Sequence, residues 1–350
     1  MSKTALITGI AGQDGSYLSE LLLEKGYRVR GVVRRSSYPH TERVDHLLAK
    51  YDDRDPDTPF KLFYADLTDT SSLRNVIEEV RPDELYNLGA QSHVGISFST
   101  GESTLEINAL GPFRILDTLR RLGTKTRFYQ ASSSEMFGAS PPPQSEATPF
   151  LPQSPYGVSK AAAFYTTRLH RVAYKMFAAN GILFNHESPR RGINFVTRKI
   201  TRGIASIVAG EIRTLYLGNL DAKRDWGFAG DYVEAIWRIL QHHEPDDFVI
   251  ATEDTHTVRE FLKETFSLLG VDWEDFVVCE DRYLRPAEVP ALLGDATKAR
   301  TVLKWQPKVQ FPELCRMMLE SDLMAKGFTL EEARQKAGSL KGGRLTREKA

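Results

Sequence analysis

The sequence has few cysteines, no net charge and no long hydrophobic run. Cys279 and Cys315 are the only cysteines in 350 residues, too few for a metal site of four thiolates. Basic and acidic residues number 46 each, so no global field favours nucleic acid or an anionic membrane. The first residues lack the blocks of a signal peptide, and no apolar run approaches membrane-spanning length. We therefore expect a cytoplasmic protein with reduced thiols and without nucleic-acid, membrane or metal partners.

A glycine-rich turn near the N-terminus predicts a nucleotide-binding domain. The short apolar run 5–8 leads into Gly9, Gly12 and Gly15, and a helical pattern begins at Tyr17. Glycines at these intervals let the backbone turn tightly and approach a pyrophosphate, which the N-terminus of the following helix would bind. An ordinary glycine-rich turn is the alternative.

The end of the next strand indicates which dinucleotide would bind. The strand predicted at 28–33 leads into Arg34, Arg35 and Ser36, where an acidic residue would otherwise accept a hydrogen bond from an adenosine ribose. Guanidinium and hydroxyl groups suit a 2′-phosphate, so this pattern predicts NADP. A solvated basic loop is the alternative.

Strands and helices alternate through the first half of the chain. Apolar runs predict further strands at 61–64, 84–88, 127–131 and 182–184. Helical patterns between them include 105–122 and 156–179. This repeat indicates an α/β fold with a Rossmann-type doubly wound parallel sheet.

The domain organisation follows from where the repeat fades. We assign residues 1–184 to an NADP-binding Rossmann domain, rejoined by about 225–256. A smaller, interleaved α/β domain that binds the substrate would comprise 185–224 and 257–326. The remaining residues, 327–350, would form a short helix and a disordered basic tail.

Four side chains in the middle of the chain suggest acid–base chemistry. Ser133 and Glu135 follow the strand predicted at 127–131, so they lie at the same edge of the sheet as the glycine turn. Tyr156 and Lys160 are spaced four residues apart, on one face of the following helix. The cation can lower the pKa of the phenol and make it a general acid or base. Taken alone, this spacing is also common on surface helices.

Three polar loops after the sixth predicted strand suit a phosphorylated substrate. They span 185–192, 218–226 and 285–288, and they contribute cations and amides. Each loop alone could equally be ordinary surface. His186 stands beside Glu187 without a second histidine at ligand spacing, so we expect a structural or cofactor contact there and no metal.

Together these motifs resemble the extended short-chain dehydrogenase/reductase superfamily and, within it, the GDP-mannose 4,6-dehydratase family. The resemblance lies in TGIAGQDGSYL, RRSS, YNLGAQSHV, SPYGVSK, NGILFNHESPRRG, NFVTRKI, GNLDAKRDWG, DYVEA and RPAEV, which span Thr8 to Glu288. It implies a hydro-lyase that converts GDP-D-mannose to GDP-4-dehydro-6-deoxy-D-mannose and water. A hydride would pass from C4 to C6 through bound NADP, the first step towards GDP-fucose, GDP-rhamnose or related GDP-deoxysugars.

The resemblance also implies a role for individual residues. Tyr156, assisted by Lys160, would take the proton of the sugar 4-hydroxyl. Glu135 would remove the C5 proton, and Ser133 would bond the 4-hydroxyl. Contacts to NADP would come from Gly9, Gly12, Gln13, Asp14, Gly15, Arg34, Arg35, Ser36, Asp66, Leu67, Leu88, Ala90, Ser92, Tyr156, Lys160, His186 and Arg191. Contacts to GDP-mannose would come from Ser92, Ser133, Glu135, Asn185, Lys199, Gly218, Arg224, Arg285 and Glu288.

One departure and two alternatives accompany the resemblance. Ser133 stands where the family usually has threonine, so the hydroxyl is kept but its rotamer is less restricted. The family commonly assembles as homotetramers or dimers, and we expect a homotetramer. An NADP-dependent reductase or epimerase of a GDP-linked sugar would share Tyr156 but would not need Glu135. An NADP-sensing interaction protein would use the fold for binding alone.

Overall fold

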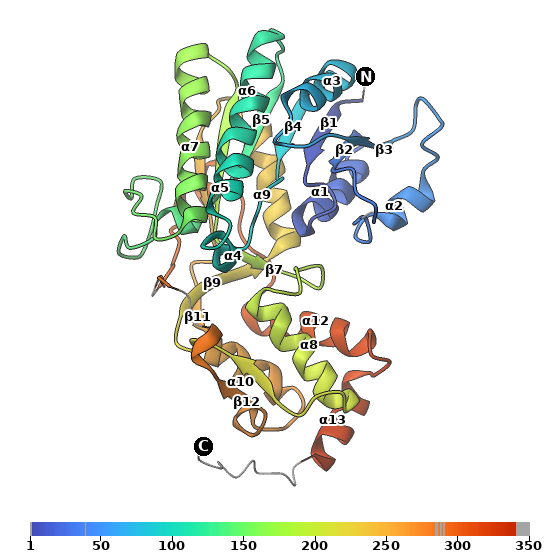
Figure 1. Cartoon of the computed structure of the whole chain (residues 1–350), viewed down its shortest axis with the longest axis vertical. Helices are drawn as coiled ribbons and strands as arrows, with labels where there is room; N and C mark the ends of the chain where they lie inside the picture. The colour runs from blue at the N-terminus through green and yellow to red at the C-terminus, as the bar shows by residue number, and fades with distance from the viewer. Residues whose placement is uncertain (1, 39, 284–285, 288, 290, 341–350) are drawn as a thin grey trace.

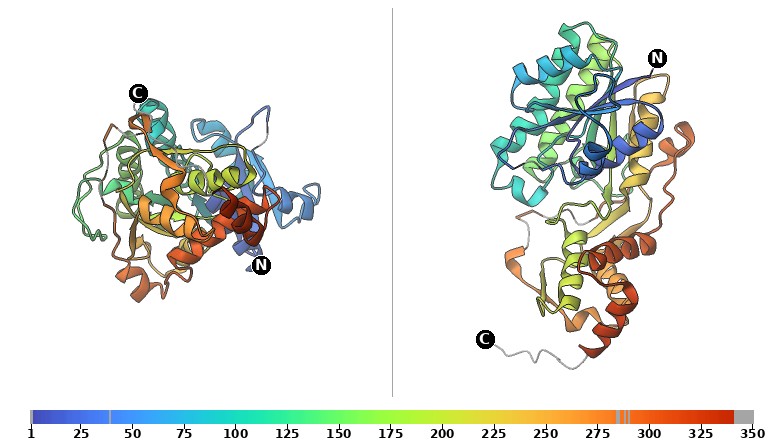
Figure 2. Two further views of the ribbon diagram at one scale, coloured as in Figure 1. Left: turned by 90° about the horizontal axis from the view of Figure 1, so that it is seen from below. Right: turned by 90° about the vertical axis from the view of Figure 1, so that its right-hand side faces the viewer.

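The computed structural model describes residues 2–38, 40–283, 286–287, 289 and 291–340. Arg285, Glu288 and the predicted tail beyond residue 340 lie outside the described residues. A larger part built on a parallel sheet and a smaller, mainly helical part lie at opposite ends of the long axis (Figures 1 and 2).

Seven strands form the central sheet in the order β10-β6-β5-β4-β1-β2-β3. They are β1 (Thr4–Thr8), β2 (Arg28–Val33), β3 (Phe60–Tyr64), β4 (Glu84–Asn87), β5 (Arg127–Ser133), β6 (Ala178–Leu183) and β10 (Asp247–Ile250). All neighbouring strands pair in parallel, and the order changes direction between β1 and β4. The structure therefore confirms the predicted α/β fold with a Rossmann-type doubly wound sheet, whose ligands lie outside the carboxyl ends of the strands.

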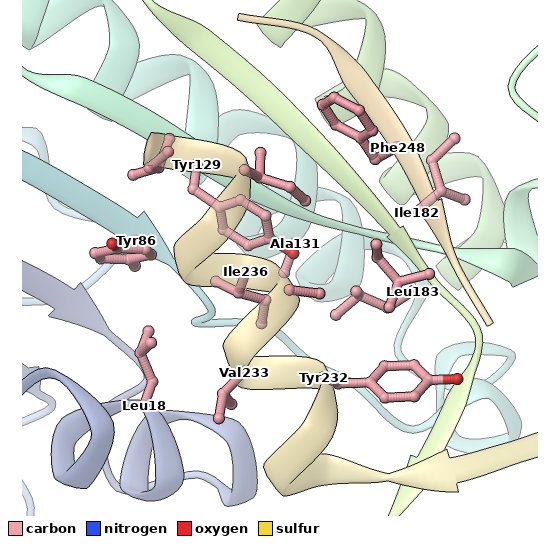
Figure 3. Packing of buried hydrophobic residues seen from close by; sticks show 14 of the residues in the cluster. Leu18, Tyr86, Tyr129, Ala131, Ile182, Leu183, Tyr232, Val233, Ile236 and Phe248 are labelled. Atoms are coloured by element: carbon pink, nitrogen blue, oxygen red, sulfur yellow. The ribbon is translucent and has the colours of Figure 1, made fainter. Parts of the chain in front are cut away.

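Helices cover both faces of this sheet. On one face α1 (Gln13–Glu24) packs against α9 (Ala229–Gln241), and on the other α6 (Gly111–Arg121) packs between α3 (Thr70–Val80) and α7 (Pro155–Tyr174). The main core lies between α9 and the central strands, where Ile236 approaches Tyr129 and Ala131 (Figure 3). Short helices α2 (Asp45–Lys50), α4 (Val94–Ser97), α5 (Gly101–Leu105) and α11 (Thr297–Val302) complete this part.

Local capping signals fix the ends of several helices. The side chain of Asp69 accepts a hydrogen bond from the backbone of Ser71 and so caps α3. Ser154 caps α7 by accepting from Gly157, and a proline occupies its first helical position. This cap places Tyr156 in the first turn of α7, as predicted.

The predicted boundaries of the helix 156–179 and of the strand 182–184 are wrong. Helix α7 ends early because Lys175 adopts a left-handed conformation (φ 56°), and β6 follows at once. Small residues suit β6 because a Cβ on Gly181 would lie 2.3 Å from the hydroxyl of Tyr129 on β5. Strand pairing therefore outweighs the helix propensity of the alanines in this stretch.

The helix predicted at 105–122 is interrupted. A π-helical turn, Glu106–Leu110, joins α5 to α6. Pro112, near the start of α6, lacks a backbone N–H and cannot continue a regular hydrogen-bond ladder. The turn inserts Asn108, whose side chain bonds the loop after β4 and the hydroxyl of Ser159 on α7. Extra residues of this kind occur often at functional sites.

The smaller part has a core of its own. Its helices are α8 (Val196–Ala209), α10 (Val258–Ser267), α12 (Phe311–Met324) and α13 (Leu330–Ser339). A three-stranded sheet, β11-β9-β7, and a pair, β12-β8, accompany them: β7 (Asn185–Glu187), β8 (Leu215–Leu217), β9 (Lys223–Phe228), β11 (Thr255–Thr257) and β12 (Val277–Cys279). Helix α13 begins with the capping box of Thr329 and Glu332, within the stretch where a short helix was predicted.

The chain passes between the two parts several times. Three segments line the core of the smaller part: 200–226, 258–276 and 311–337. Two later segments pack into the core of the sheet: 232–251 and 289–305. The sequence assigned all of 257–326 to the smaller domain, but residues 289–305 within that range pack into the core of the sheet. The other domain boundaries stay a prediction.

Candidate active site

The four predicted catalytic residues lie together at the carboxyl edge of the sheet. Ser133 is the last residue of β5, Glu135 lies in the 3₁₀ turn that follows, and Tyr156 and Lys160 lie in the first two turns of α7. All four side chains are buried. A Cβ on Gly157 would lie 2.7 Å from the carbonyl oxygen of Glu135, so glycine lets α7 pack directly against the catalytic turn.

Burial dominates the acid–base behaviour of the tyrosine and the lysine. It raises the pKa of Tyr156 to about 12 and lowers the pKa of Lys160 to about 8. The amine donates to the carbonyl of Ala131 at 2.8 Å and lies 5.8 Å from the centre of the Tyr156 ring. Burial therefore outweighs the contributions that lower the pKa of Tyr156, which include a hydrogen bond with Ser133 and the charge of Arg191. The predicted lowering by Lys160 stays a prediction.

Glu135 differs from most buried carboxylates in this protein. Its backbone N–H donates to the hydroxyl of Ser133, which fixes the turn. Its carboxylate accepts no hydrogen bond from any residue that the structure describes, although the residue is only 7% exposed. A buried carboxylate without partners is costly, so the turn keeps an acceptor ready for a substrate proton.

The glycines of the turn after β1 allow close contacts between backbone segments. Gly9 has φ +69°, and a Cβ there would lie 2.7 Å from the nitrogen of Gly89 in the loop after β4. A Cβ on Gly15 would lie 2.4 Å from the carbonyl of Gly9. Only glycine permits this packing, which leads directly into the N-terminus of α1. The pyrophosphate contact at this turn stays a prediction.

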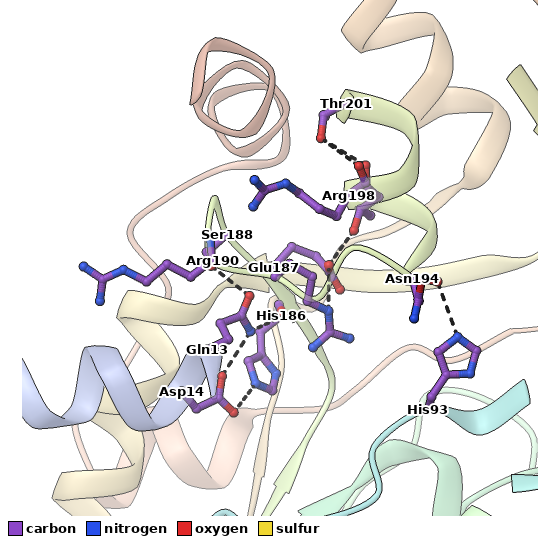
Figure 4. Close-up of polar contacts among 12 residues, drawn as sticks. Gln13, Asp14, His93, His186, Glu187, Ser188, Arg190, Asn194, Arg198 and Thr201 are labelled. Atoms are coloured by element: carbon purple, nitrogen blue, oxygen red, sulfur yellow. Dashed lines mark hydrogen bonds and ion pairs between the residues drawn. The ribbon is translucent and has the colours of Figure 1, made fainter. Parts of the chain in front are cut away.

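Asp14 and His186 form a buried ion pair beside this turn (Figure 4). The carboxylate lies 2.8 Å from Nε2 of His186, and the other ring nitrogen bonds the carbonyl of Phe184 at 2.7 Å. Both ring nitrogens thus face acceptors, which requires the imidazolium. Despite burial, the pair raises the pKa of His186 and lowers that of Asp14. Gln13 bridges the same segments, because its amide bonds the carbonyl of His186 and the hydroxyl of Ser188.

Other residues predicted to contact NADP follow the ends of β2, β3 and β4. Arg34, Arg35 and Ser36 are exposed after β2, and Asp66 and Leu67 follow β3. The carboxylate of Asp66 accepts bonds from its own turn, at the backbone and hydroxyl of Thr68. Leu88, Ala90 and Ser92 lie in the loop after β4. The sheet therefore brings these residues to one edge.

Four residues predicted to hold the sugar nucleotide lie on or next to elements after β6: Asn185, Lys199, Gly218 and Arg224. Lys199 on α8 lies 3.8 Å from the centre of the Tyr283 ring, and a Cβ on Gly218 would lie 2.6 Å from the carbonyl of Tyr283. Arg224 on β9 donates to the carbonyl of Val289. These residues thus flank the segment that carries Arg285 and Glu288, which lie outside the described residues. Asn185 starts β7, paired with β9.

Two buried residues with contacts to this site were not assigned a role from the sequence. Asn108 connects the loop after β4 to α7, and nothing in its helical surroundings distinguished it. Glu187 lies within the polar stretch 185–192, and its carboxylate lies 3.1 Å from Nε of Arg191. A charged residue at the end of a buried strand was the available signal for Glu187.

The described residues contain neither a membrane-spanning helix nor a cluster of metal ligands. None of the helices there is long and apolar enough to cross a membrane. Within the same ranges, no three or more histidine, cysteine, aspartate or glutamate side chains lie together as metal ligands would. Cys279 is exposed and Cys315 is buried, and both are free thiols.

The fold and the site together define a class of protein. A doubly wound parallel sheet carries a glycine turn after its first strand. It also carries a hydroxyl and a carboxylate after its fifth, with the Tyr156–Lys160 helix packed against them. This is the architecture of the extended short-chain dehydrogenases/reductases.

Comparison with known sequences identifies the family within this class. The family model described as "GDP-mannose 4,6 dehydratase" matches residues 6–318. GDP-mannose 4,6 dehydratase 2 of Arabidopsis thaliana is 56% identical over 329 residues, which cover 92% of this chain and 87% of the relative. The GDP-mannose 4,6 dehydratase of Homo sapiens is 51% identical, with 91% of each chain covered. This chain belongs to the GDP-mannose 4,6-dehydratase family.

Solved structures agree with the fold. A UDP-glucose 4-epimerase of Thermotoga maritima superimposes with a TM-score of 0.79 at 23% identity, covering 93% of this chain and 99% of the other. A dTDP-glucose 4,6-dehydratase of Bacillus anthracis, solved in complex with NAD, gives 0.78 at 20% identity, covering 95% and 100%. At these identities the likeness shows the fold alone.

Proposed function

We propose that this protein is a GDP-D-mannose 4,6-dehydratase, a hydro-lyase that forms GDP-4-dehydro-6-deoxy-D-mannose and water. The single observation that carries the proposal is the pairing of two buried groups, Tyr156 and Glu135, on turns that pack directly against each other. An alcohol oxidation needs one base, whereas dehydration next to the new ketone needs a second. Membership of the GDP-mannose 4,6-dehydratase family supports the choice of substrate.

Tyr156 is the group that exchanges the proton of the sugar 4-hydroxyl. With a pKa of about 12 the phenol is protonated at neutral pH in the structure described, so little phenolate is present to act as a base. The contacts that favour the phenolate are therefore central to the forward reaction: the Ser133 hydroxyl and the charge of Arg191. Lys160, fixed by the carbonyl of Ala131, supplies a cation on the same helix.

Glu135 is the base for the carbon acid. Once C4 is a ketone, the proton at C5 becomes acidic, and loss of the C6 hydroxyl as water follows its removal. A carboxylate with no hydrogen bond from the described residues is free to take that proton. Ser133 holds the turn by accepting from the backbone of Glu135, so the hydroxyl and the carboxylate keep a fixed relation.

The chain fits NADP as its cofactor. The dinucleotide would lie on the glycine turn, with Arg34, Arg35 and Ser36 at the 2′-phosphate. When bound, it supplies reversible hydride exchange, from C4 of the sugar and back to C6. No acidic residue stands at the end of β2, which favours NADP over NAD. Mass spectrometry of the dinucleotide released from the purified protein tests this choice.

The sugar nucleotide would lie between the sheet and the smaller part. Arg224 and the arginine at 285 are assigned to the diphosphate, while Asn185 and Lys199 hold other groups of the substrate. Burial, aided by the charge of Arg282, lowers the pKa of Lys199, and its amine lies over the ring of Tyr283. These assignments come from the family resemblance together with the grouping of the described residues.

We also propose a homotetramer that contains a dimer contact on α7. An apolar stripe of that helix is exposed, formed by Val158, Tyr165, Leu169 and Val172, with Phe113 of α6 beside it. Such a stripe on a water-facing helix favours contact with a second copy. A monomer mass in light scattering would contradict this assembly. Free thiols at both cysteines are compatible with the cytoplasmic location that we retain as part of the proposal.

The experiment that tests the function uses GDP-mannose deuterated at C4, with the purified protein and no added cofactor. Deuterium found at C6 of the product by proton NMR would support internal hydride return, bound dinucleotide and dehydration together. Reaction only with stoichiometric NADPH would favour the reductase or epimerase alternative. No reaction at all would favour the sensor.

A further inference from the structure

Tyr64 is an exposed aromatic residue at the edge of the central sheet. It ends β3, the last strand in the sheet order, and 58% of its surface is exposed. The reaction proposed above gives it no part. Yet it stands two residues before Asp66, in the row of strand ends outside which the ligands of a doubly wound sheet lie.

The ring of Tyr64 lies against the guanidinium of Arg35. Strands β2 and β3 pair in parallel with Val33 opposite Tyr64, so Arg35, two residues beyond Val33, is within reach of the ring. The carbon of the guanidinium lies over the ring, 4.7 Å from its centre. This is the geometry of a cation–π contact, which attracts the cation to the face of the ring. Tyr64 therefore holds Arg35 from the neighbouring strand.

This contact leaves the hydrogen-bond donors of Arg35 available. A guanidinium over a ring uses its face, whereas the N–H groups that bond phosphate lie along its edge. Arg35 is exposed, and it forms no ion pair and donates no hydrogen bond to any residue that the structure describes. The turn beside it is held by the backbone N–H of Tyr38, which donates to the hydroxyl of Ser36 at 3.3 Å. An ordered guanidinium with available donors fits a phosphate group.

Arg34 provides a comparison within the same turn. It is exposed like Arg35, but no aromatic ring among the described residues lies against its guanidinium. A long side chain loses rotamer freedom when it binds a ligand, and a side chain that is already held loses less. Arg35 should therefore contribute more than Arg34 to the binding of a phosphate.

We propose that Tyr64 is a positioning residue, which holds the guanidinium of Arg35 in place for the 2′-phosphate and so raises the preference for NADP over NAD. The inference rests on the proposed function, since it deepens the choice of cofactor made there. Tyr64 acts through Arg35 and needs no contact of its own with the dinucleotide. Because NAD lacks the 2′-phosphate, the contact should strengthen the binding of NADP alone.

The main test compares the affinities for NADPH and NADH, followed by nicotinamide fluorescence after removal of any resident dinucleotide. Tyr64→Leu should weaken NADPH binding about two- to fivefold, the range of one exposed cation–π contact, and leave NADH binding unchanged. Tyr64→Phe keeps the ring and should bind both like the wild type. A merely structural role would weaken both dinucleotides alike. Equal weakening, or none, in Tyr64→Leu would overturn the proposal.

The chain offers a matched control at the far end of α7. Tyr174 is 48% exposed, and the guanidinium of Arg120 lies over its ring at 5.0 Å. Tyr156 lies in the first turn of this helix and Tyr174 is its last residue, so the two are about 27 Å apart along the axis. Tyr174→Leu should leave both affinities unchanged. If it lowers the preference for NADPH as Tyr64→Leu does, the proposal fails.

Double variants separate action through Arg35 from a direct contact. In an Arg35→Met background, Tyr64→Leu should weaken NADPH binding no further. In an Arg34→Met background, the same substitution should keep its full two- to fivefold effect. A further loss in the Arg35→Met background would mean that Tyr64 contacts the dinucleotide itself, which would contradict the positioning role.

Fragments of the dinucleotide separate this inference from the proposed function. Adenosine 2′,5′-bisphosphate should displace NADPH less well from Tyr64→Leu than from the wild type, relative to adenosine 5′-monophosphate. If the wild type does not dehydrate GDP-mannose but this difference is found, the function is wrong and the role of Tyr64 stands. If the wild type binds NADH as tightly as NADPH, the choice of NADP and the role of Tyr64 both fail. If the wild type prefers NADPH and Tyr64→Leu keeps that preference, the role of Tyr64 alone fails.

Discussion

Glu135 and Asp322 are both buried carboxylates, yet their surroundings differ. In the smaller part, Arg198 and Thr201 bond the two oxygens of Asp322 at 2.6–3.0 Å. At the sheet edge, the carboxylate of Glu135 receives no such bond from the described residues. A buried charge with partners maintains packing, whereas one without partners costs stability and is available for chemistry. The completeness of the bonding therefore separates structural groups from reacting ones more clearly than burial does.

The largest expected effect follows from removing the charge of Glu135, the carboxylate without hydrogen-bond partners. Glu135→Gln should lower the rate of dehydration roughly 10³-fold or more, because the carbon acid loses its base. The melting temperature should stay the same or rise, since an unbonded buried charge is removed. Oxidation at C4 should persist, so reduced dinucleotide should still form. Its absorbance, recorded before and after GDP-mannose is mixed with the variant, measures this step. A variant with the full dehydration rate would refute the role of Glu135.

The second largest effect follows from removing the charge of Asp322, the carboxylate with partners. Asp322→Asn leaves Arg198 buried without its counter-ion, which should cost about 3–5 kcal/mol in the free energy of unfolding. The turnover number per folded molecule should be unchanged, because the pair lies in the smaller core. Urea unfolding and an activity assay on the same sample measure the two quantities. A loss of turnover in the folded variant would show that the comparison is drawn too sharply.

Asp225 is a third buried carboxylate. It accepts several hydrogen bonds, yet its pKa is raised. Its carboxylate accepts from the backbone and hydroxyl of Thr252 and from the backbones of Glu253 and Gly294. These bonds lower its pKa, but desolvation outweighs them and raises it to about 6. The folded protein therefore binds this proton more tightly than the unfolded chain does.

The sign of the pH effect follows from that raised pKa. The stabilising contribution of the Asp225 proton is fully present below about pH 4 and is lost as the pH rises through about 6. Its size is on the order of 3 kcal/mol. The free energy of unfolding of the wild type, relative to Asp225→Asn, should fall between pH 4 and pH 6. A difference that is constant across this window would contradict the raised pKa.

The smallest effect concerns the hydroxyl beside Tyr156. Ser133→Thr keeps the oxygen that bonds the phenol and the backbone of Glu135, while the added methyl restricts its rotamer. The turnover number of Ser133→Thr should change by no more than about threefold. In Ser133→Ala, the limb of the pH–rate profile that reports the phenolate of Tyr156 should also move to higher pH. A tenfold loss in Ser133→Thr would mean that the buried pocket lacks room for the methyl group.

Local signals made much of the fold predictable. The bounds of β2 were correct because their causes lie within a few neighbouring residues. The end of α7 was missed because it depends on the contact of Gly181 with Tyr129, which lies on another strand. The π-helical turn at Asn108 was missed for the same reason, since its partners lie in the loop after β4 and on α7.

The site was predictable in its membership but not in its electrostatics. Sequence placed Ser133, Glu135, Tyr156 and Lys160 at one sheet edge, and the structure confirms that placement. It also suggested that Lys160 tunes Tyr156, because the two are close along a helix. The pKa of Tyr156 also depends on desolvation and on Arg191, 35 positions further along the chain, which no local spacing reveals.

The repeated passage of the chain between its two cores limits how such a protein can be rebuilt. The segments that line the smaller core are separated by stretches that belong to the sheet, so no single excision removes the smaller part intact. To change the sugar-nucleotide preference by recombination, all three segments of the smaller core would have to be exchanged together. Gradual substitution of residues in place is therefore the more accessible route to a new sugar nucleotide.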